Sequence, residues 1–266
     1  MLIRNLLLIK KNNGLIIQLV RREVASRYKG SFLGIIWSFI TPLLMLLVYT
    51  FVFSLVFKSR WPGQSESQIE FALLIFSGMT MYNIFSEVVG KSSNLIPNNS
   101  NYVKKVVFPL AILPVVTLIS TLIHAAISIL ILLCGLILFY NGIHLTVLLL
   151  PIVMLPMLLL TLGISWFVAS IGVFFRDIGH LVNILLQVLM FLSPIFYPIE
   201  SIPQSLRFLY YINPLSYTVE DARKVLVWGQ TPNWVWIGTG SLIGLMIFIL
   251  GYGWFQKTRE GFSDVL

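Results

Sequence analysis

The feature that most constrains this chain is a long apolar run that begins just after a basic cluster. From Phe32 to Phe57 the sequence has no charged residue, and the run is longer than the roughly 20 residues that cross ~30 Å of hydrocarbon as a helix. Just upstream lie Arg21, Arg22, Arg27 and Lys29. We therefore expect a basic, water-facing segment that leads into a first membrane-spanning helix.

The basic segment has the two-sided pattern of an interfacial helix when it is read at about 100° per residue. Its apolar arc holds Ile16, Ile17, Val20, Val24 and Tyr28, and its polar arc holds Gln18, Arg21, Arg22, Ala25, Ser26 and Lys29. Such a helix sinks its apolar side chains to the acyl boundary and keeps its arginines among phosphates and water. Residues 1–30 are predicted to form this N-terminal cytoplasmic helix.

The composition excludes a soluble domain. Of the 266 residues, 58% are hydrophobic and 11% are charged, whereas charged residues make up about a quarter of a soluble domain. The net charge of +8 does not indicate nucleic acid as a partner, because 7 of the 18 Lys and Arg residues lie before residue 30. Binding to anionic membrane lipid and membrane orientation explain this distribution better.

Six apolar segments divide the chain into a transmembrane domain over residues 31–255 and a short polar tail over 256–266. The predicted spans are 32–57, Phe71–Val89, Leu110–Tyr140, His144–Phe175, Ile178–Tyr197 and Trp234–Phe255. The fold class is therefore an all-α membrane protein with six transmembrane helices. With this arrangement, 13 Lys and Arg residues lie on the side of the termini and 5 on the other side. The positive-inside rule then places both termini in the cytoplasm.

The connection between the fifth and sixth spans, residues 200–233, is too long for a turn and too polar to span. Asn213 and Pro214 suit the start of a helix, and Gly229 suits its end. Its apolar positions are Leu215, Val219, Ala222 and Leu226, with Glu220, Asp221, Arg223 and Lys224 opposite. We predict a short amphipathic helix on the outer face, lying flat on the bilayer or capping an exit, with a shorter one over 203–211.

The last span contains Gly240 and Gly244, a spacing that permits close contact between helices in lipid. One interpretation is a helix contact within the subunit, and the other is a functional role.

The sequence offers no nucleotide, metal or catalytic site. The stretch Gly90-Lys91-Ser92 resembles a phosphate loop but has Phe85 where a glycine is required, and it follows a membrane helix. His124, His144 and His180 have no carboxylate or cysteine at ligand spacing. An energy-driven function would therefore need an ATPase on another chain, and we expect no cofactor in this one.

Two ionisable residues lie within predicted spans and are functional candidates for that reason. For His124 the alternative is a neutral ring hydrogen-bonded across the bundle. For Glu87 the alternative is a side chain that reaches water at the cytoplasmic end of its helix.

Three motifs resemble those of a known family. The first is Arg27-Tyr28-x-x-Ser31-x-Leu33-Gly34-x-x-Trp37-x-x-x-x-Pro42, the second is Phe174-Phe175-Arg176-Asp177, and the third is Lys104-Lys105-x-x-Phe108-Pro109 with a second proline at Pro114. Together they resemble the permease subunits of ABC transporters that export O-antigen, capsule or teichoic-acid polysaccharides. The chain departs from that pattern at Leu110, where a basic residue is frequent in the family.

The resemblance implies a homodimer with two ATPase subunits, in which ATP and Mg bind to the partner chain. It implies a multi-pass protein of the bacterial inner membrane that moves a polyprenyl-pyrophosphate-linked glycan outward. A pyrophosphate headgroup needs cationic donors at the inner interface. The candidates for substrate entry are Arg21, Arg22, Arg27, Tyr28, Lys29, Ser31, Gly34 and Trp37. The alternative is that these cations bind bulk anionic lipid only.

The resemblance also implies a coupling segment over residues 90–109 that carries a short helix against the ATPase. The coupling candidates are Asn98, Asn99, Tyr102, Lys104, Lys105, Arg176 and Asp177. A solvated linker and a simple helix-end anchor are the alternatives for the two parts of this set.

Aromatic side chains are further candidates, because aromatic faces stack on sugar C–H surfaces and the family's channel is lined with them. The set comprises Phe39, Tyr49, Phe53, Phe191, Phe196 and Tyr197. The alternative is that they face lipid or the membrane interface.

Two other functions remain open at this point. One is the export of a smaller lipid or drug. The other is a membrane-embedded glycolipid transferase, which would need paired acidic residues or histidines at a membrane surface. In the sequence only Asp177, close to His180, approaches that pattern.

Overall fold

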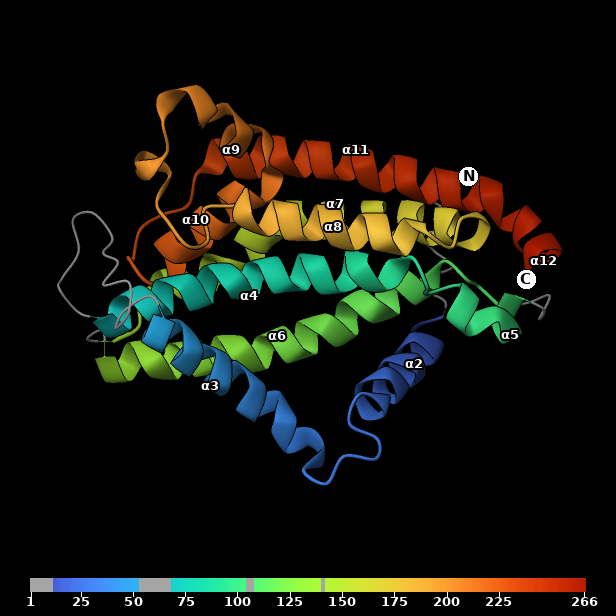
Figure 1. Cartoon of the computed structure of the whole chain (residues 1–266), viewed down its shortest axis with the longest axis horizontal. Helices are drawn as coiled ribbons and strands as arrows, with labels where there is room; N and C mark the ends of the chain where they lie inside the picture. The colour runs from blue at the N-terminus through green and yellow to red at the C-terminus, as the bar shows by residue number, and fades with distance from the viewer. Residues whose placement is uncertain (1–11, 53–67, 104–107, 140–141) are drawn as a thin grey trace.

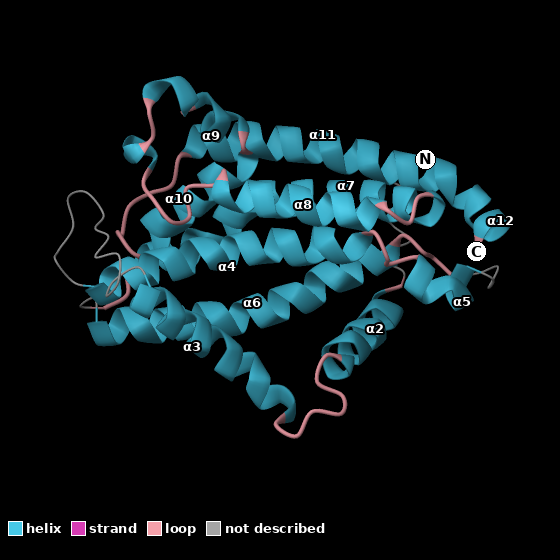
Figure 2. Ribbon diagram, in the orientation of Figure 1, coloured by secondary structure: helices cyan, strands magenta, loops and turns pink. Residues whose placement is uncertain are grey.

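The computed structural model describes residues 12–52, 68–103, 108–139 and 142–266, and these residues form helices and the loops between them (Figure 2). The all-helical fold class is thus confirmed for the described part of the chain. The predicted channel residue Phe53 and the coupling residues Lys104 and Lys105 lie outside it.

Five helical stretches in the described residues are long and apolar enough to cross a membrane. The first joins a short 3-10 turn, η1, to α3 and continues to Val52. The elements are η1 (Gly34–Ile36), α3 (Trp37–Tyr49), α4 (Gln68–Ser92), α6 (Ile112–Phe139), α7 (Leu150–Phe174, preceded by η4, Leu145–Leu149) and α11 (Trp234–Thr258). They agree with five of the six predicted spans to within a few residues at most ends.

The predicted fifth span, Ile178–Tyr197, is shorter than expected. Helix α8 (Ile178–Phe191) has 14 residues, which at 1.5 Å per residue is about 21 Å and less than the hydrocarbon thickness. The chain leaves the helix before Pro194, as the steric effect of proline on the preceding residue favours. The count of six spans therefore stays a prediction.

Close packing concentrates on α4, α7 and α11. Of the most apolar window of α4, 83% is buried inside the protein, against 6% for the window of α3. A Cβ added at Gly251 of α11 would lie 2.0 Å from the carbonyl oxygen of Gly163 of α7, and one added at Gly244 would lie 2.8 Å from that of Pro156. The helix-contact interpretation of Gly240 and Gly244 is thus confirmed, although the closest approach is at Gly251.

The N-terminal helix, α2 (Asn13–Ser26), lies beside α6 (Figure 1). Its buried side chains are Ile16, Leu19 and Val20, which pack in one cluster with residues of α6. Ile17 of the predicted apolar arc is 53% exposed and takes no part in this cluster, so its contact with lipid stays a prediction.

At the opposite end of the bundle, the connection between α8 and α11 forms η5 (Ile199–Ser201), η6 (Gln204–Leu206), α9 (Phe208–Ile212) and α10 (Pro214–Leu226). The side chain of Asn213 caps α10, and Gly229 follows it with a φ of +65°. The prediction of Asn213 as the N-cap is confirmed, whereas the C-cap is Val227, two residues before the predicted Gly229.

The prediction of a polar face on α10 exposed to water is wrong, because Asp221 and Arg223 are buried. The guanidinium of Arg223 donates to the carbonyl oxygens of Leu74 at 3.1 Å, Pro194 at 2.5 Å and Ile195 at 2.6 Å. Burial lowers the pKa of Arg223 to about 10, which leaves it charged at neutral pH. Helix α10 is therefore clamped between α4 and the end of α8 and does not lie flat on a bilayer.

The tail is also more than a polar extension. After η7 (Arg259–Gly261), helix α12 (Phe262–Val265) places the fully buried Phe262 against Phe255 and Phe174. Short helix α5 (Ser100–Val103), preceded by η3 (Pro97–Asn99), lies at this same end of the bundle (Figure 1). We call it the α5 end, and the opposite one the α10 end.

Candidate functional site

A pocket lined by many polar side chains lies among α3, α4 and α6. It has a volume of about 300 Å³. Its polar lining comprises Arg27, Tyr28, Ser38, Thr41, Thr80, Asn83, Ser86, Glu87, Thr121, His124 and Ser128. On α4 and α6 these residues recur at steps of three or four, which places them on one face of each helix. Polar groups at membrane depth are costly and commonly functional, so we call this cavity the polar pocket and treat it as the candidate site.

A second cavity adjoins it beside α2. It has a volume of about 540 Å³ and is lined by Glu23, Ser26, Arg27, Glu87, Lys91, Ser120 and His124. We call it the mouth cavity. It shares Arg27, Glu87 and His124 with the polar pocket, so these three side chains stand where the two spaces meet.

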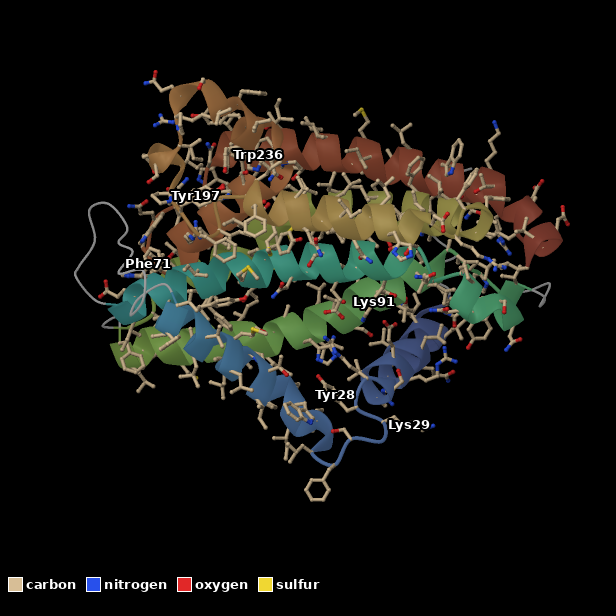
Figure 3. All side chains as sticks on the ribbon, in the orientation of Figure 1. Tyr28, Lys29, Phe71, Lys91, Tyr197 and Trp236 are labelled. Atoms are coloured by element: carbon tan, nitrogen blue, oxygen red, sulfur yellow. The ribbon has the colours of Figure 1, made fainter. Side chains whose placement is uncertain are left out.

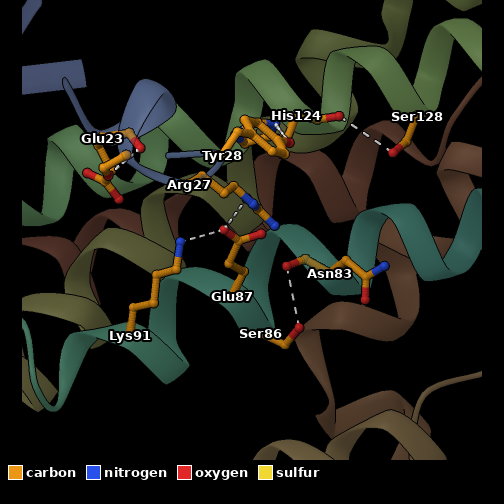
Figure 4. A network of polar contacts seen from close by, with 10 residues as sticks. Glu23, Arg27, Tyr28, Asn83, Ser86, Glu87, Lys91, His124 and Ser128 are labelled. Carbon is orange, nitrogen blue, oxygen red and sulfur yellow. Dashed lines mark hydrogen bonds and ion pairs between the residues drawn. The ribbon is translucent and has the colours of Figure 1, made fainter. Parts of the chain in front are cut away.

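One carboxylate oxygen holds two cations at this junction (Figure 4). Glu87 Oε1 accepts hydrogen bonds from Arg27 Nη1 at 2.7 Å and from Lys91 Nζ at 2.6 Å. The side chains of Arg27 and Lys91 are 41% and 45% exposed, and that of Glu87 is 22% exposed. Glu87 is thus paired within the chain, which the interpretation of a side chain reaching for water did not include.

A second carboxylate, Glu23 on α2, lines the mouth cavity without a direct ion pair in the described residues. Burial raises the pKa of the Glu23 carboxyl, and the nearby Lys91 charge opposes that rise. The mouth cavity therefore carries two carboxylates and two cations, and its formal charge is balanced when the imidazole is neutral.

His124, which lines both cavities, meets Tyr28 at the wall of the polar pocket. The Tyr28 hydroxyl lies 3.2 Å from His124 Nδ1, and the two rings meet edge to face with centroids 5.6 Å apart. The predicted hydrogen bond of His124 is therefore present, but its partner comes from the segment after α2 and not from another span across the bundle.

The predicted substrate-entry residues do not form one cluster. Arg27, Tyr28 and Trp37 line the polar pocket. Arg21 lies instead beside a separate apolar pocket with Tyr28, and Arg22 donates to the hydroxyl of Tyr102. Lys29 is exposed in the loop between α2 and α3 and points away from the bundle (Figure 3).

The remaining motif residues, Ser31 and Gly34, shape that loop. Gly30 and Gly34 have φ values of +84° and +52°, which glycine adopts without the steric cost that other residues incur. The amide of Gly34 donates to Ser31 at 3.3 Å. Gly34 therefore turns the chain from α2 into α3, which aims Arg27 and Trp37 toward the same pocket.

The described coupling residues gather at the α5 end. Asn98 and Asn99 lie in η3, where Asn99 Nδ2 donates to the carbonyl oxygen of Leu95 at 2.9 Å. Tyr102 of α5 stacks on Phe108 with centroids 4.1 Å apart and accepts from Arg22 of α2. Exposed Arg176 and Asp177 lie in the link between α7 and α8.

The predicted channel aromatics do not line one surface of the single chain. Tyr49 lines the polar pocket, while Phe39 of α3 and Phe191 of α8 are 47% and 60% exposed. Phe196 packs near Phe191, and the hydroxyl of Tyr197 contacts that of Tyr210 at the α10 end (Figure 3).

Sequence reasoning missed Glu23, Lys91 and Asn83 as parts of this site. Lys91 was set aside with the false phosphate loop, and the other two were not considered. The signal that could have found them is the polar spacing along α4, where Thr80, Asn83, Glu87 and Lys91 follow one another at three- and four-residue steps.

Comparison with known proteins gives the family. A model described as the ABC-2 type transporter matches residues 14–227. The chain belongs to the ABC-2 type transporter family. This ABC-2 type chain is 29% identical over 253 residues to the O-antigen export system permease protein RfbA of Myxococcus xanthus, with 94% of this chain and 95% of the relative covered. A Klebsiella pneumoniae protein of that name is 25% identical, with 95% of each chain covered.

The polysialic acid transport protein KpsM of Escherichia coli is 27% identical over 245 residues, covering 90% of this ABC-2 type chain and 91% of the relative. The resemblance to polysaccharide export permeases that the three motifs indicated is confirmed. The matched family region includes α2, the polar pocket and α10.

Proposed function

We propose that this chain is the permease subunit of an ATP-driven exporter that carries polyprenyl-pyrophosphate-linked polysaccharide of the O-antigen, capsule or teichoic-acid type. The observation that carries the proposal is the mouth cavity with its two cations, which shares Arg27, Glu87 and His124 with the polar pocket between spans. Relatives named for O-antigen export and polysialic acid transport support the same class of cargo.

The chemistry of the mouth cavity suits an anionic headgroup. Arg27 supplies guanidinium donors and Lys91 supplies ammonium donors at one point. Charge-assisted hydrogen bonds to phosphate are among the strongest in proteins. The hydroxyls and amides of the polar pocket would then face the first sugar of the lipid-linked glycan.

ATP hydrolysis on a separate partner subunit would act at the α5 end, which the positive-inside rule places in the cytoplasm together with both termini. The contact between Arg22 and Tyr102 joins α5 to α2, and α2 leads directly into Arg27. A push on α5 therefore has a short path to the mouth cavity. The outward path would leave near the α10 end.

The channel would form between two copies of the chain. Phe39 and Phe191 are exposed on a single chain, and α3 is covered by few of its own neighbours. A second copy would enclose such surfaces, which supports a homodimer with two ATPase subunits in the bacterial inner membrane.

The test uses inverted membrane vesicles that contain the chain and its ATPase, with lipid-linked glycan as substrate. ATP-dependent movement of the glycan into the lumen is expected. Replacing both Arg22→Ala and Arg27→Ala should lower transport at least about tenfold, because each lost charge-assisted bond is worth about 1.5–3 kcal/mol. Membrane insertion should be unaffected.

Lys257→Ala is the matched control, since it removes an exposed cation of α11 that lies away from both cavities. If the double variant transports as well as this control, Arg22 and Arg27 have no part in export. Transport of a small lipid or drug with none of the glycan would favour the smaller-cargo exporter.

A membrane-embedded glycolipid transferase is a second candidate because Glu23, Glu87 and His124 line one cavity. This is the acidic pair with a histidine that the sequence did not reveal. The test is incubation of the purified chain, without an ATPase, with lipid-linked glycan and a sugar donor. A covalently modified lipid would favour the transferase, and an unchanged lipid would exclude that activity under these conditions.

A further inference from the structure

The carboxylate of Glu87 occupies the place where an anionic ligand would bind. A single oxygen, Oε1, accepts from both Arg27 Nη1 at 2.7 Å and Lys91 Nζ at 2.6 Å. The two cations come from different parts of the chain and converge on this oxygen (Figure 4). An oxygen of a phosphate group in the same place would meet the same two donors.

The cations retain binding capacity in this arrangement. A guanidinium has five N–H donors and an ammonium has three, and Glu87 takes one bond from each. Both side chains are between two-fifths and one-half exposed, so a ligand entering the mouth cavity can reach them.

Two buried hydroxyls beside these cations have no hydrogen-bond partner in the described residues. Ser120 Oγ lines the mouth cavity and Thr121 Oγ1 lines the polar pocket, and the two residues are 3% and 2% exposed. Buried polar groups are normally satisfied. Adjacent residues of a helix point in different directions, so the Ser120 hydroxyl is available to a ligand in the mouth cavity and that of Thr121 to a ligand in the polar pocket.

We propose that Glu87 is an internal substitute for a phosphate group, and that a diphosphate headgroup displaces it from Arg27 and Lys91. This rests on the proposed function in that the headgroup belongs to the exported lipid. Glu87 sets an affinity threshold, because every anionic ligand must displace this carboxylate and is weakened by the same factor. A phosphodiester with one negative charge gains little over the carboxylate that it replaces. A diphosphate has more negative charge and more acceptor oxygens than a carboxylate, so it binds the two cations more strongly.

Glu87 thereby separates the two interpretations that the basic residues allowed at the start. Bulk anionic phospholipid, with one charge per headgroup, does not displace Glu87 from Arg27 and Lys91. The diphosphate-linked lipid displaces Glu87 and binds. Without Glu87 the same cations would bind either one.

The test measures binding of two lipids to the purified full-length chain in nanodiscs of neutral lipid. The probes are farnesyl diphosphate and phosphatidylglycerol. We expect the unaltered chain to bind the diphosphate about tenfold or more tightly than phosphatidylglycerol, which corresponds to one charge-assisted bond. Glu87→Gln should raise the affinity for both lipids by about tenfold, because neither lipid then has to displace a carboxylate.

Glu260→Gln is the matched control, because it removes one carboxylate from an exposed position on η7. It should keep the affinities of the unaltered chain. Glu87→Asp retains the charge and should also keep affinities close to those of the unaltered chain, which protects the test if Glu87→Gln fails to fold. An excess of inorganic pyrophosphate should displace farnesyl diphosphate, since the headgroup makes the contacts.

The inference is overturned if Glu87→Gln and Glu260→Gln bind phosphatidylglycerol with the same affinity, or if inorganic pyrophosphate does not compete. Its failure is distinguishable from that of the proposed function. Normal glycan transport in vesicles with unchanged lipid affinities in Glu87→Gln would reject the role of Glu87 alone. Absent transport with the expected rise in affinity would reject the export function and leave the anion site in place.

Discussion

Two arginines at opposite ends of the bundle are bound in opposite ways. Arg223 of α10 is completely buried, donates to backbone carbonyls of α4 and of the chain after α8, and lies 3.5 Å from the Glu220 carboxylate of its own helix. Arg27 is 41% exposed, faces two cavities and shares a single carboxylate oxygen with Lys91. The same side-chain chemistry is therefore used once as a permanent clamp and once at an open site.

The packing around Arg223 is close, whereas that around Arg27 leaves cavities. We call α4, α7, α10 and α11 the packed half, where helices approach to backbone contact and α4 is largely buried. We call α2 and α3 with the facing sides of α4 and α6 the open half, where the cavities lie. A buried charge held by backbone carbonyls and a carboxylate of its own helix cannot exchange these partners without a large cost. Partly exposed ion pairs contribute little to stability and can change partners, which suits a site that must admit and release a ligand.

The largest expected effect comes from removing the clamp. Arg223→Met would leave buried carbonyl oxygens of Leu74, Pro194 and Ile195 without this donor. Breaking such a buried set costs about 3–5 kcal/mol. We expect a lower unfolding midpoint for the detergent-solubilised protein, measured by tryptophan fluorescence on heating.

Arg207→Met is the matched control at the same end. Arg207 also donates to two backbone carbonyls, those of Ile202 and Glu200, but it is partly exposed to solvent. Its loss should cost no more than about 1 kcal/mol, because water can replace the donor. Equal midpoints for the two variants would show that Arg223 is not a clamp.

A smaller effect is expected at the contact between α7 and α11. Gly251→Ala places a Cβ 2.0 Å from the carbonyl oxygen of Gly163, so the two backbones must separate. Overpacking of this kind costs about 1–3 kcal/mol, and the unfolding midpoint should fall. Gly253→Ala on the same helix meets nothing within 4 Å and should be neutral or slightly stabilising. A midpoint for Gly251→Ala that matches Gly253→Ala would contradict the close packing of this half.

Much of this fold could be predicted from hydropathy and turn signals. Apolar length located five membrane-spanning helices, and Asn213 with Pro214 located the start of α10. What the sequence could not reveal was how α10 is buried. A helix pattern with charges on one side normally indicates exposure, and the acceptors that bury Arg223 are carbonyl groups, which every residue carries and no pattern marks.

The candidate site could be predicted only in part for a related reason. Arg27, Tyr28 and Trp37 of the motif line the polar pocket, and Gly34 fixes a local turn between Tyr28 and Trp37, while their role in substrate entry stays a prediction. The partners Glu87 and Lys91 come from another helix, so no spacing in the sequence relates them to Arg27. Contacts between distant segments depend on how helices pack, and packing is decided by shape.

The smallest effect tests whether the open half tolerates the loss of a charge. Burial raises the pKa of Glu23 above its ordinary value of 4.5, so the folded protein holds this proton more tightly than the unfolded chain. For such a group, stability is greatest below the unfolded pKa and falls as the pH rises through the folded pKa. Ionised Glu23 thus slightly lowers the free energy of unfolding at neutral pH.

Glu23→Gln should therefore leave the unfolding midpoint at pH 7 unchanged or slightly higher, with a gain of less than about 1 kcal/mol in the free energy of unfolding. It should also remove part of the decline in stability above pH 4.5 that the unaltered chain shows. Glu260→Gln, exposed on η7, provides the comparison. A clear drop in the midpoint of Glu23→Gln would mean that Glu23 stabilises the fold through Lys91 and its neighbours, and that the open half is held together by its charges as firmly as the packed half is by Arg223.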